Sequence, residues 1–481
     1  MTLLDIGLKV DPTRLSPLCD KLRSYGYLET PIAELLGRFD ISELVGKEYP
    51  SYIWRCERED SELAKLVGIF LMGRATDRET LTALLGQDLL EALKACGLLL
   101  EFKGQMASHA VIYPCLGRYI LTDQWVGGSG PQSEGKVYEL GTDSYVLARV
   151  TPRRGVRRAL DLCTGSGVHA VMSAQTAELS RAVDINPRAL QYTELNAALN
   201  DVGCSTHLGD LYTAVEGETF DLITANPPFV PSPDPDVLVH RSAGESGEEV
   251  PQRLVAGLPT HLEPGGLFSM VLDHPVFESE TYLDRLERWL GHKSGWGIAV
   301  LTFHTLTVAN YIRDHLQGVE TYDETFRKYL ESYARLGIQS MEFANVFITR
   351  LKEDAPNWKV EQRSNWPNVS LVPQVEEWLD AQRDFHSPSL RLDEESKPRL
   401  SSHYRSVWHD WDRARGALEV ADGNWFPPDP LSAEETDLLL LTKSGELTVR
   451  ELRAQFKGDF DRAIRGLGKR RALAGLTARR D

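Results

Sequence analysis

Asp161-Leu162-Cys163-Thr164-Gly165-Ser166-Gly167 is the stretch that decides the predicted fold. Its first two residues end a short predicted strand at 159–162, and a helical pattern follows it at 168–177. The two glycines let the backbone come close to a ligand at the N-terminus of the following helix. The stretch is therefore typical of a strand–turn–helix unit that binds a nucleoside cofactor, although a tight turn alone is equally compatible with a structural role.

Apolar runs of strand length alternate with helix-length segments over residues 136–352, and this alternation predicts the fold class. The predicted strands are 159–162, 181–184, 220–225, 267–272, 297–301 and 342–350. Strands separated by helices form a mostly parallel sheet that is covered on both faces. Such a sheet binds ligands at the carboxyl ends of its strands. We therefore expect an α/β, Rossmann-like core over 136–352.

Acidic residues at three successive strand ends bear on the choice of cofactor. Asp161 precedes the glycine turn, Asp184 ends the next strand at the spacing of a ribose-binding acid, and Asp210 is placed to meet an adenine amine. A nicotinamide dinucleotide would put its pyrophosphate beside Asp161, whereas the cationic groups of S-adenosylmethionine tolerate a carboxylate. We therefore expect S-adenosylmethionine. The predicted cofactor-binding residues are Asp161, Thr164, Gly165, Gly167, Asp184, Ile185, Asp210, Leu211 and Asn226.

A second motif, Asn226-Pro227-Pro228-Phe229, follows the predicted strand 220–225. Here the sequence resembles the class I S-adenosylmethionine-dependent methyltransferases, in the amino-methylating branch that carries Asn-Pro-Pro-Tyr/Phe. The resemblance implies that the Asn226 side-chain oxygen and the Pro227 carbonyl accept hydrogen bonds from a target NH2 group, and that Phe229 stacks on its planar group. Such a nitrogen is a poor nucleophile because its lone pair is delocalised. Two acceptors would orient that lone pair toward the methyl group, and no strong general base is required.

Within that branch, the chain is similar to the release-factor glutamine methyltransferases over about 135–352. The similar segments are 141–147, which in that family covers the cofactor, the signature at 226–231, and a glycine-containing loop at 241–247. Phe229 replaces the usual Tyr, and both flanking regions are larger than in that family. The resemblance implies a protein glutamine amide as the methyl acceptor. An exocyclic amine of an rRNA guanine or of a DNA or RNA adenine, or a small molecule, stays open, whereas a cofactor-free binding module is disfavoured by the intact motifs.

The N-terminal region, 1–125, is predicted to be a helical, winged-helix-like accessory domain. Three short helices precede a β-ribbon at 98–100 and 110–113, and Thr76 with Glu79 resembles a capping box. This fold occurs as a nucleic-acid reader or as a lid or dimerisation module. We favour the second role because the third helix is not basic. A glycine-rich stretch at 125–136 reads as a linker.

The C-terminal region, 353–481, is predicted to be a small helical accessory region, winged-helix-like at 430–481. Capping boxes are expected at Ser432 with Glu435 and at Thr448 with Glu451. The last helix runs into Lys469-Arg470-Arg471, which is compatible with a contact to RNA or with a solvated helix terminus.

Bulk properties narrow the class of protein. The chain has 481 residues and a formal net charge of -17, which favours solubility and disfavours a generic polyanion-binding surface. Its six cysteines are scattered without a Cys-x-x-Cys pair, so we expect neither a disulfide framework nor a metal site. The N-terminus lacks the pattern of a signal peptide, and no uncharged stretch is long enough to span a bilayer. We expect a cytoplasmic protein without a membrane partner; the oligomeric state stays open.

Overall fold

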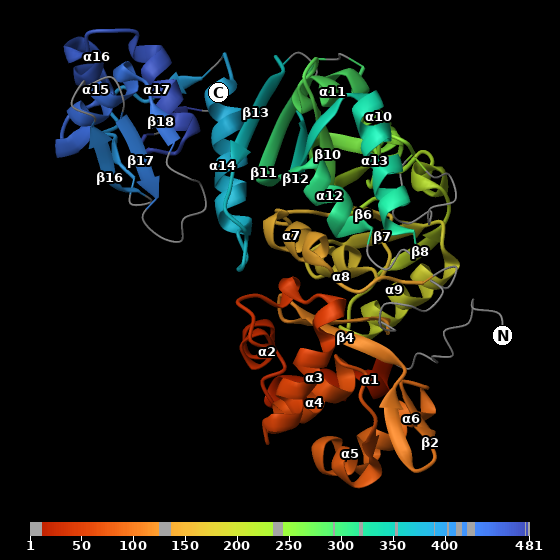
Figure 1. Ribbon diagram of the computed structural model, residues 1–481. Coiled ribbons are helices and arrows are strands. Elements are labelled where there is room, and N and C mark those ends of the chain that lie inside the picture. Colours follow the sequence, from red (N-terminus) through yellow and green to blue (C-terminus); the bar gives the residue numbers. More distant parts are fainter. Residues whose placement is uncertain are drawn as a thin grey trace.

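An eight-stranded sheet forms the centre of the molecule, with the strand order β13-β11-β12-β10-β9-β6-β7-β8 (Figure 1). The strands are β6 (Arg158–Leu162), β7 (Leu179–Asp184), β8 (Ser205–Leu208), β9 (Phe220–Ala225), β10 (Leu262–Phe277), β11 (Trp296–Thr307), β12 (Ile338–Arg350) and β13 (Trp358–Arg363). All pair in parallel except β12, which runs antiparallel to both β10 and β11. The predicted α/β class is confirmed, and the strand expected at 342–350 begins earlier, at Ile338.

The computed structural model describes residues 12–124, 136–233, 244–291, 294–316, 321–351, 355–388, 390–401, 404–409, 416–420, 429–476 and 478–479. The predicted linker at 125–136 lies outside these ranges except for Lys136, and residues 241–243 of the loop at 241–247 also lie outside them. No helix in the described ranges is long and apolar enough to cross a membrane.

Helices cover both faces of the sheet. One face carries α7 (Thr142–Val150), α8 (Val168–Ala174), α9 (Pro187–Leu199) and α14 (Val372–His386), and the other carries α10 (Glu249–His261) and α11 (Tyr282–Trp289). Successive residues of β10 serve the two layers, since Val271 packs with α7 and α14 while Leu272 packs with α10 and α11. Because both faces are buried, such strands read as continuous apolar runs. This double burial explains why the central strands were predictable.

The N-terminal region packs directly on the core. It contains α1 (Pro12–Ser24), α2 (Glu29–Leu36), α3 (Tyr49–Arg58), α4 (Glu62–Phe70), α5 (Arg78–Leu85), α6 (Gln87–Ala95) and the strands β1 (Thr76–Asp77), β2 (Leu99–Phe102), β3 (Gln105–Ser108), β4 (Ala110–Cys115) and β5 (Arg118–Asp123). Asn196 of α9 pairs with the backbone of Leu121, accepting at 2.7 Å and donating at 2.9 Å. Asn200 pairs with Tyr119 in the same way. Two helix amides therefore complete the edge of β5 and join the region to the core.

The start of α5 differs from the prediction. Its N-cap is Asp77, whose carboxylate accepts from the Thr80 amide at 2.7 Å, so the capping box expected at Thr76 with Glu79 is wrong. Either residue type caps a helix well, and the structure selects the one directly before the first helical turn. Three helices, α4 to α6, precede the β2–β3 ribbon, but the ribbon expected between 98–100 and 110–113 is wrong, because 110–113 lie in β4, which pairs with β5. The winged-helix interpretation itself stays a prediction.

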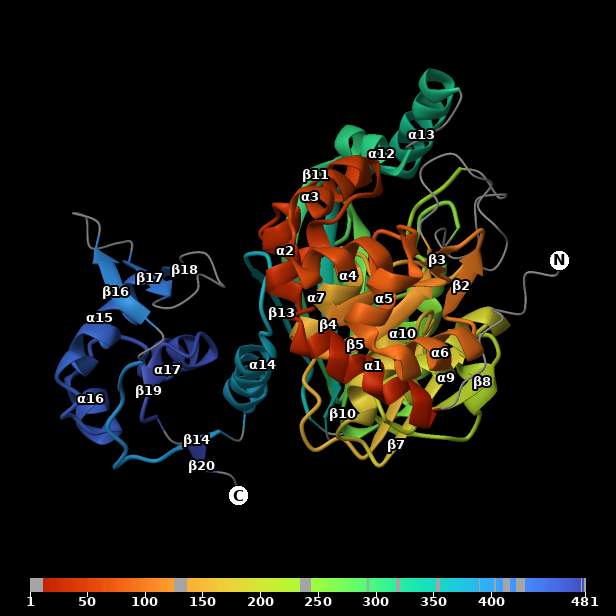
Figure 2. The same ribbon diagram turned by 90° about the horizontal axis from the view of Figure 1, so that it is seen from below.

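The C-terminal region has two parts: one that ends with α14 and belongs to the central sheet, and one after α14 that has its own core. Strand β13 is the edge strand of the central sheet, pairing with β11 from Gly297 to Thr302, and α14 packs against the sheet. The core unit therefore extends past the boundary expected at residue 352. Beyond α14 a separate unit has its own apolar core, formed around α15 (Ala433–Leu441), α16 (Val449–Gln455) and α17 (Phe460–Lys469) (Figure 2). Both expected capping boxes are present there.

The basic end of α17 is paired with acids. Arg470 contacts Glu435 at 2.8 Å, and Arg471 forms an ion pair with Glu377 of α14. These contacts neutralise two of the three cations that had suggested a contact to RNA.

Candidate active site

The two sequence motifs meet at the carboxyl ends of adjacent strands. Leu162, the last residue of β6, pairs with Ala225, the last residue of β9, and with Val183 of β7. The glycine turn and the Asn-Pro-Pro-Phe turn therefore leave the sheet at the same level and side by side. This is the edge at which parallel α/β sheets bind their ligands.

The two glycines of the turn have different roles. Both have positive φ, +54° at Gly165 and +79° at Gly167. A Cβ at Gly167 would lie 2.6 Å from the Oγ1 atom of Thr193 on α9, so this glycine permits close helix packing. A Cβ at Gly165 would meet no atom within 4 Å. The turn is therefore open to a ligand at Gly165.

Asp184 ends β7 and holds the glycine turn in place. Its carboxylate accepts hydrogen bonds from the backbone amides of Gly165 and Asn186, both at 2.9 Å. Burial nevertheless raises the pKa of Asp184 above its usual range. The next residue, Ile185, is 54% exposed and presents an apolar surface beside this carboxylate.

The other acids of the predicted site are placed differently. Asp161 is buried, and its carboxylate accepts hydrogen bonds from the hydroxyls of Thr164 at 2.6 Å and Thr224 at 2.7 Å. Burial raises the pKa of Asp161 to about 6. Asp210 is exposed and forms an ion pair with Arg253 at 2.6 Å, while Leu211 beside it is buried. Asp161 thus joins Thr164 of the glycine turn to Thr224 of β9. Its expected contact with a cofactor stays a prediction.

Asn226 has a fixed side-chain orientation. Its Nδ2 atom donates to the Asp143 carboxylate at 2.8 Å and to the Ser144 hydroxyl at 3.4 Å. Both partners belong to the first turn of α7, within the 141–147 segment singled out by family resemblance. With Nδ2 committed to a carboxylate, Oδ1 is the atom of this amide left for a ligand. Sequence reasoning did not assign Asp143, and its only signal was its place in that segment.

The rest of the Asn-Pro-Pro-Phe turn is held by neighbouring elements. The Tyr333 hydroxyl of α13 (Tyr322–Leu336) donates to the Pro231 carbonyl at 2.8 Å. Gly247, with φ +76°, lies so close to the turn that a Cβ would be 2.3 Å from the Phe229 carbonyl oxygen. Phe229 is partly buried against the core that contains α10 and α11. These contacts hold the backbone of the turn at Phe229 and Pro231.

His169 lies just inside α8 and is buried, with neither ring nitrogen hydrogen-bonded. Burial lowers its pKa to about 3, so the ring is neutral and packs in the core. His169 therefore has a packing role rather than a catalytic one.

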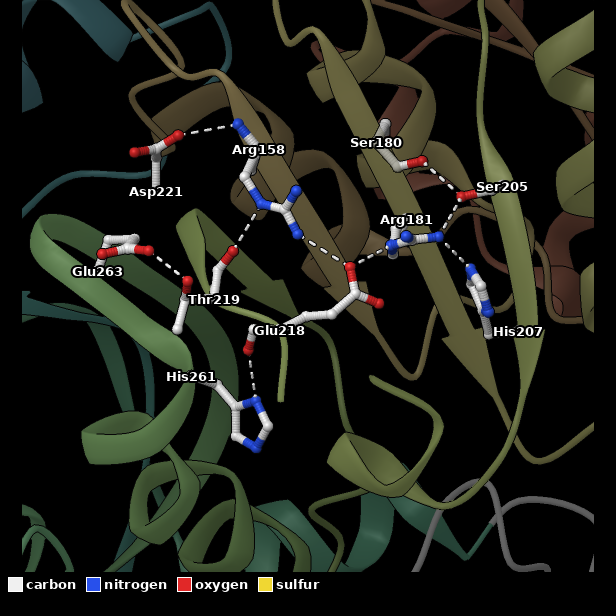
Figure 3. Close-up of polar contacts among 10 residues, drawn as sticks. All are labelled: Arg158, Ser180, Arg181, Ser205, His207, Glu218, Thr219, Asp221, His261 and Glu263. Carbon is white, nitrogen blue, oxygen red and sulfur yellow. Dashed lines mark hydrogen bonds and ion pairs between the residues drawn. The ribbon is translucent and has the colours of Figure 1, made fainter. Parts of the chain in front are cut away.

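An extensive polar network lies at the opposite, amino ends of the strands (Figure 3). Glu218 accepts from Arg158 at 2.9 Å and from Arg181 at 2.8 Å, and Arg181 contacts His207 at 2.8 Å. Asp221 accepts from the Arg158 backbone amide at 2.8 Å. These charges satisfy one another and tie β6, β7, β8 and β9 together, so the network stabilises the sheet.

The residues at the carboxyl edge of the sheet suit a positively charged nucleoside. Asp184 and Asp210 supply carboxylates, Ile185 supplies an apolar surface, and Gly165 supplies an open backbone. Within the described ranges, no group of three or more His, Cys, Asp or Glu side chains is arranged to hold a metal ion. All six cysteines are free thiols.

Comparison with known proteins points to the same part of the chain. Residues 137–293 match the family model described as the methyltransferase small domain. A Methanocaldococcus jannaschii protein, provisionally named a protein N5-glutamine methyltransferase, is 30% identical over 152 residues, covering 30% of this chain and 77% of that protein.

Two further relatives match a smaller share of their own length. The release factor glutamine methyltransferase of Koribacter versatilis is 33% identical over 143 residues, covering 27% of this chain and 51% of that protein. The ribosomal protein uL3 glutamine methyltransferase of Xanthomonas campestris pv. campestris is 35% identical over 145 residues, covering 28% of this chain and 46% of that protein. The chain thus spans about half the length of these two relatives.

Proposed function

The chain belongs to the class I S-adenosylmethionine-dependent methyltransferases that contain the methyltransferase small domain, and we propose that it methylates the side-chain amide nitrogen of a protein glutamine. The observation that carries this proposal is the fixed amide of Asn226 at the end of β9, directly beside the glycine turn. A planar NH2 group is the acceptor that such an arrangement suits.

The acceptor site follows from the orientation of Asn226. Asp143 holds the Nδ2 atom, so Oδ1 accepts one N–H of the substrate amide. The Pro227 carbonyl accepts the other N–H, and Phe229 lies against the amide plane. Holding both N–H bonds directs the nitrogen lone pair out of that plane toward the glycine turn. Positioning of this kind supplies several kcal/mol of the barrier reduction.

The cofactor site uses the neighbouring strand ends. Asp184 binds the ribose hydroxyls, because its carboxylate is already oriented by two backbone amides. Ile185 covers one side of the adenine, and Asp210 meets its amine. Bound S-adenosylmethionine supplies an electrophilic methyl group on a sulfonium. Acidic residues near this edge suit that positive charge.

A protein acceptor is favoured over a nucleic acid by the charge distribution. The net charge is -17, and Arg470 and Arg471, which had favoured RNA, are paired with Glu435 and Glu377. The three relatives described above are all named for glutamine methylation of a protein.

Replacing Asp184 with Ala tests the cofactor site. We expect the affinity for S-adenosylmethionine to fall by roughly 10- to 100-fold, since a charge-assisted hydrogen bond contributes about 1.5–3 kcal/mol. Titration calorimetry measures this affinity. The carboxylate also holds the Gly165 amide, so Asp184→Asn, which retains the shape and one acceptor, is the matched variant. Unchanged affinity in both variants would refute the ribose assignment.

To identify the acceptor, the purified protein is incubated with labelled S-adenosylmethionine and the lysate of a strain that lacks its gene. The macromolecule that takes up the labelled methyl group is then determined. The proposal predicts that the label is lost to protease and is released as methylamine by acid hydrolysis, because hydrolysis cleaves an N-methyl amide. Label that is lost to nuclease would overturn the glutamine assignment in favour of a base amine. Label that survives both enzymes would point to a small molecule.

A further inference from the structure

Helices α12 (Val308–His315) and α13 connect β11 to the antiparallel strand β12, and they project from the body of the protein (Figure 2). They share a small apolar core with the adjoining ends of β11 and β12. The turn segment, residues 226–233, contains the Asn-Pro-Pro-Phe turn and reaches this core. Val230 packs against it, while the preceding Phe229 packs against the core that contains α10 and α11. The turn segment therefore lies where two separate cores meet.

The buried face of α13 carries hydroxyl groups. Tyr329, Ser332 and Tyr333 follow the i, i+3, i+4 spacing of one helix face, and they are 5%, 4% and 1% exposed. The buried face of a surface helix is normally apolar. Because burying a polar group without a partner is costly, hydroxyl groups at these positions need partners in fixed places.

Two of these hydroxyl groups bind successive residues of the turn segment. The Tyr333 hydroxyl donates to the Pro231 carbonyl at 2.8 Å. The Tyr329 and Ser232 hydroxyls share a hydrogen bond at 3.0 Å. Both turn residues are themselves buried, so water does not compete for these contacts. Side chains one helical turn apart on α13 thus hold the turn segment at two neighbouring points.

The same helix also holds the chain where it returns to the turn segment. Ser332 donates to the Glu245 carboxylate at 3.3 Å, and Arg335 forms an ion pair with that carboxylate. The Ser232 backbone amide donates to the Gly244 carbonyl at 3.2 Å, which joins the returning chain to the turn segment directly. Helix α13 therefore contacts both pieces of chain and keeps them together.

The turn segment is stiff because of its proline content. Four of its eight residues are proline, so their φ angles are fixed and they have no backbone N–H group. Such a segment cannot be held by a continuous ladder of backbone hydrogen bonds, as a strand is. Between Pro228 and Pro231 only Phe229 and Val230 have a free φ angle. A shift at Pro231 is therefore largely carried to Phe229.

We propose that α13 sets the position of the turn segment, and that Tyr333 and Tyr329 are positioning residues for methyl transfer. The inference rests on the proposed function. The two hydroxyl groups act through Pro231 and Ser232, which fix the place of Phe229 beside the glycine turn. In-line transfer depends steeply on such placement, and a misplacement of about 1 Å lowers a rate by roughly 10²-fold.

Tyr333→Phe tests the inference because it removes one hydroxyl group and keeps the ring. We expect the maximum rate of methyl transfer to fall by roughly 10-fold, and by roughly 10²-fold when Tyr329→Phe is added. The affinity for S-adenosylmethionine should be unchanged. The rate is measured as label incorporated from saturating S-adenosylmethionine into the lysate of a strain that lacks the gene, and calorimetry measures the affinity. An equal loss of rate and affinity would overturn the positioning role.

Tyr27→Phe is the matched control. The Tyr27 hydroxyl donates to the Ile112 carbonyl at 2.8 Å, so the control loses the same kind of buried hydrogen bond, at the same length, in the N-terminal region. The two variants should melt at similar temperatures, but only Tyr333→Phe should transfer methyl groups more slowly. If Tyr27→Phe were slowed as much, the loss of rate would follow from lost stability and the inference would be overturned.

Amide hydrogen exchange gives a readout that does not depend on turnover. The turn segment has four backbone amides, at Asn226, Phe229, Val230 and Ser232. Exchange at these amides should be faster in Tyr333→Phe, because the bond between the Ser232 amide and Gly244 opens more often when α13 no longer holds the segment. Tyr27→Phe should exchange there like the wild type. Slower transfer without faster exchange would overturn the route through the turn segment.

The inference and the proposed function fail separately. Label found in a nucleic acid or in a small molecule would overturn the glutamine assignment, and the rates of Tyr333→Phe and Tyr27→Phe would then be compared on that acceptor. Wild-type rates in both Tyr329→Phe and Tyr333→Phe would overturn the inference alone, whichever acceptor takes the label.

Discussion

Asn226→Ala is expected to lower the turnover of methyl transfer by about 10³-fold and to leave the affinity for S-adenosylmethionine almost unchanged. The side chain supplies one of the two acceptors that orient the substrate amide, and that contact matters most as the transition state forms. A factor of 10³ corresponds to about 4 kcal/mol of lost transition-state stabilisation. Label incorporation at saturating substrates measures the turnover, and calorimetry measures the affinity.

Two companion variants separate the chemistry of Asn226 from its orientation. Asn226→Asp keeps an acceptor but places a second carboxylate against Asp143, so it should be about as inactive as Asn226→Ala. Asp143→Asn removes the carboxylate that fixes the amide and should cost less, roughly 10-fold, since the Asn226 side chain then samples both orientations. Wild-type turnover in Asn226→Ala would contradict the proposed mechanism.

The sheet was predictable because its central strands are apolar on both faces, as the runs at 220–225 and 267–272 are. Strand β13 was missed for the converse reason: an edge strand with Lys359, Glu361 and Arg363 does not show an apolar pattern. The meeting of the glycine turn and the Asn-Pro-Pro-Phe turn was also predictable, because both motifs lie at the ends of strands whose order follows from the fold class.

Residues whose role depends on side-chain direction were not predictable. The sequence places Asp161 at the position of a cofactor ligand, but it does not reveal that the hydroxyls of Thr164 and Thr224 donate to its buried carboxylate. The acids that pair with Arg470 and Arg471 are also distant in sequence. In each case the role of the side chain depends on a partner that is distant in the sequence, and a single sequence does not reveal that partner.

Arg149 links three parts of the chain, and its replacement by Met should lower the free energy of unfolding by about 3–5 kcal/mol. The side chain of this α7 residue is fully buried and contacts Glu29 and Asp40 of the N-terminal region, both at 2.9 Å. It also donates to the Pro367 carbonyl at 2.8 Å. Removing the cation leaves the Glu29 and Asp40 carboxylates without a counter-ion in a largely buried site, which is the costly way to break a buried ion pair.

The matched control is Arg157→Met, since Arg157 is largely exposed and lies 3.8 Å from Asp221. An exposed pair of this kind contributes about 0–1 kcal/mol, so the control should unfold like the wild type. Arg149→Lys retains the charge but not the planar group that reaches several acceptors, and it should fall between the two. Urea unfolding followed by tryptophan fluorescence measures all three variants. If Arg149→Met unfolded at the same urea concentration as Arg157→Met, the ion pairs of Arg149 would not hold the N-terminal region to α7, and the continuous apolar core around α9 would carry that interface instead.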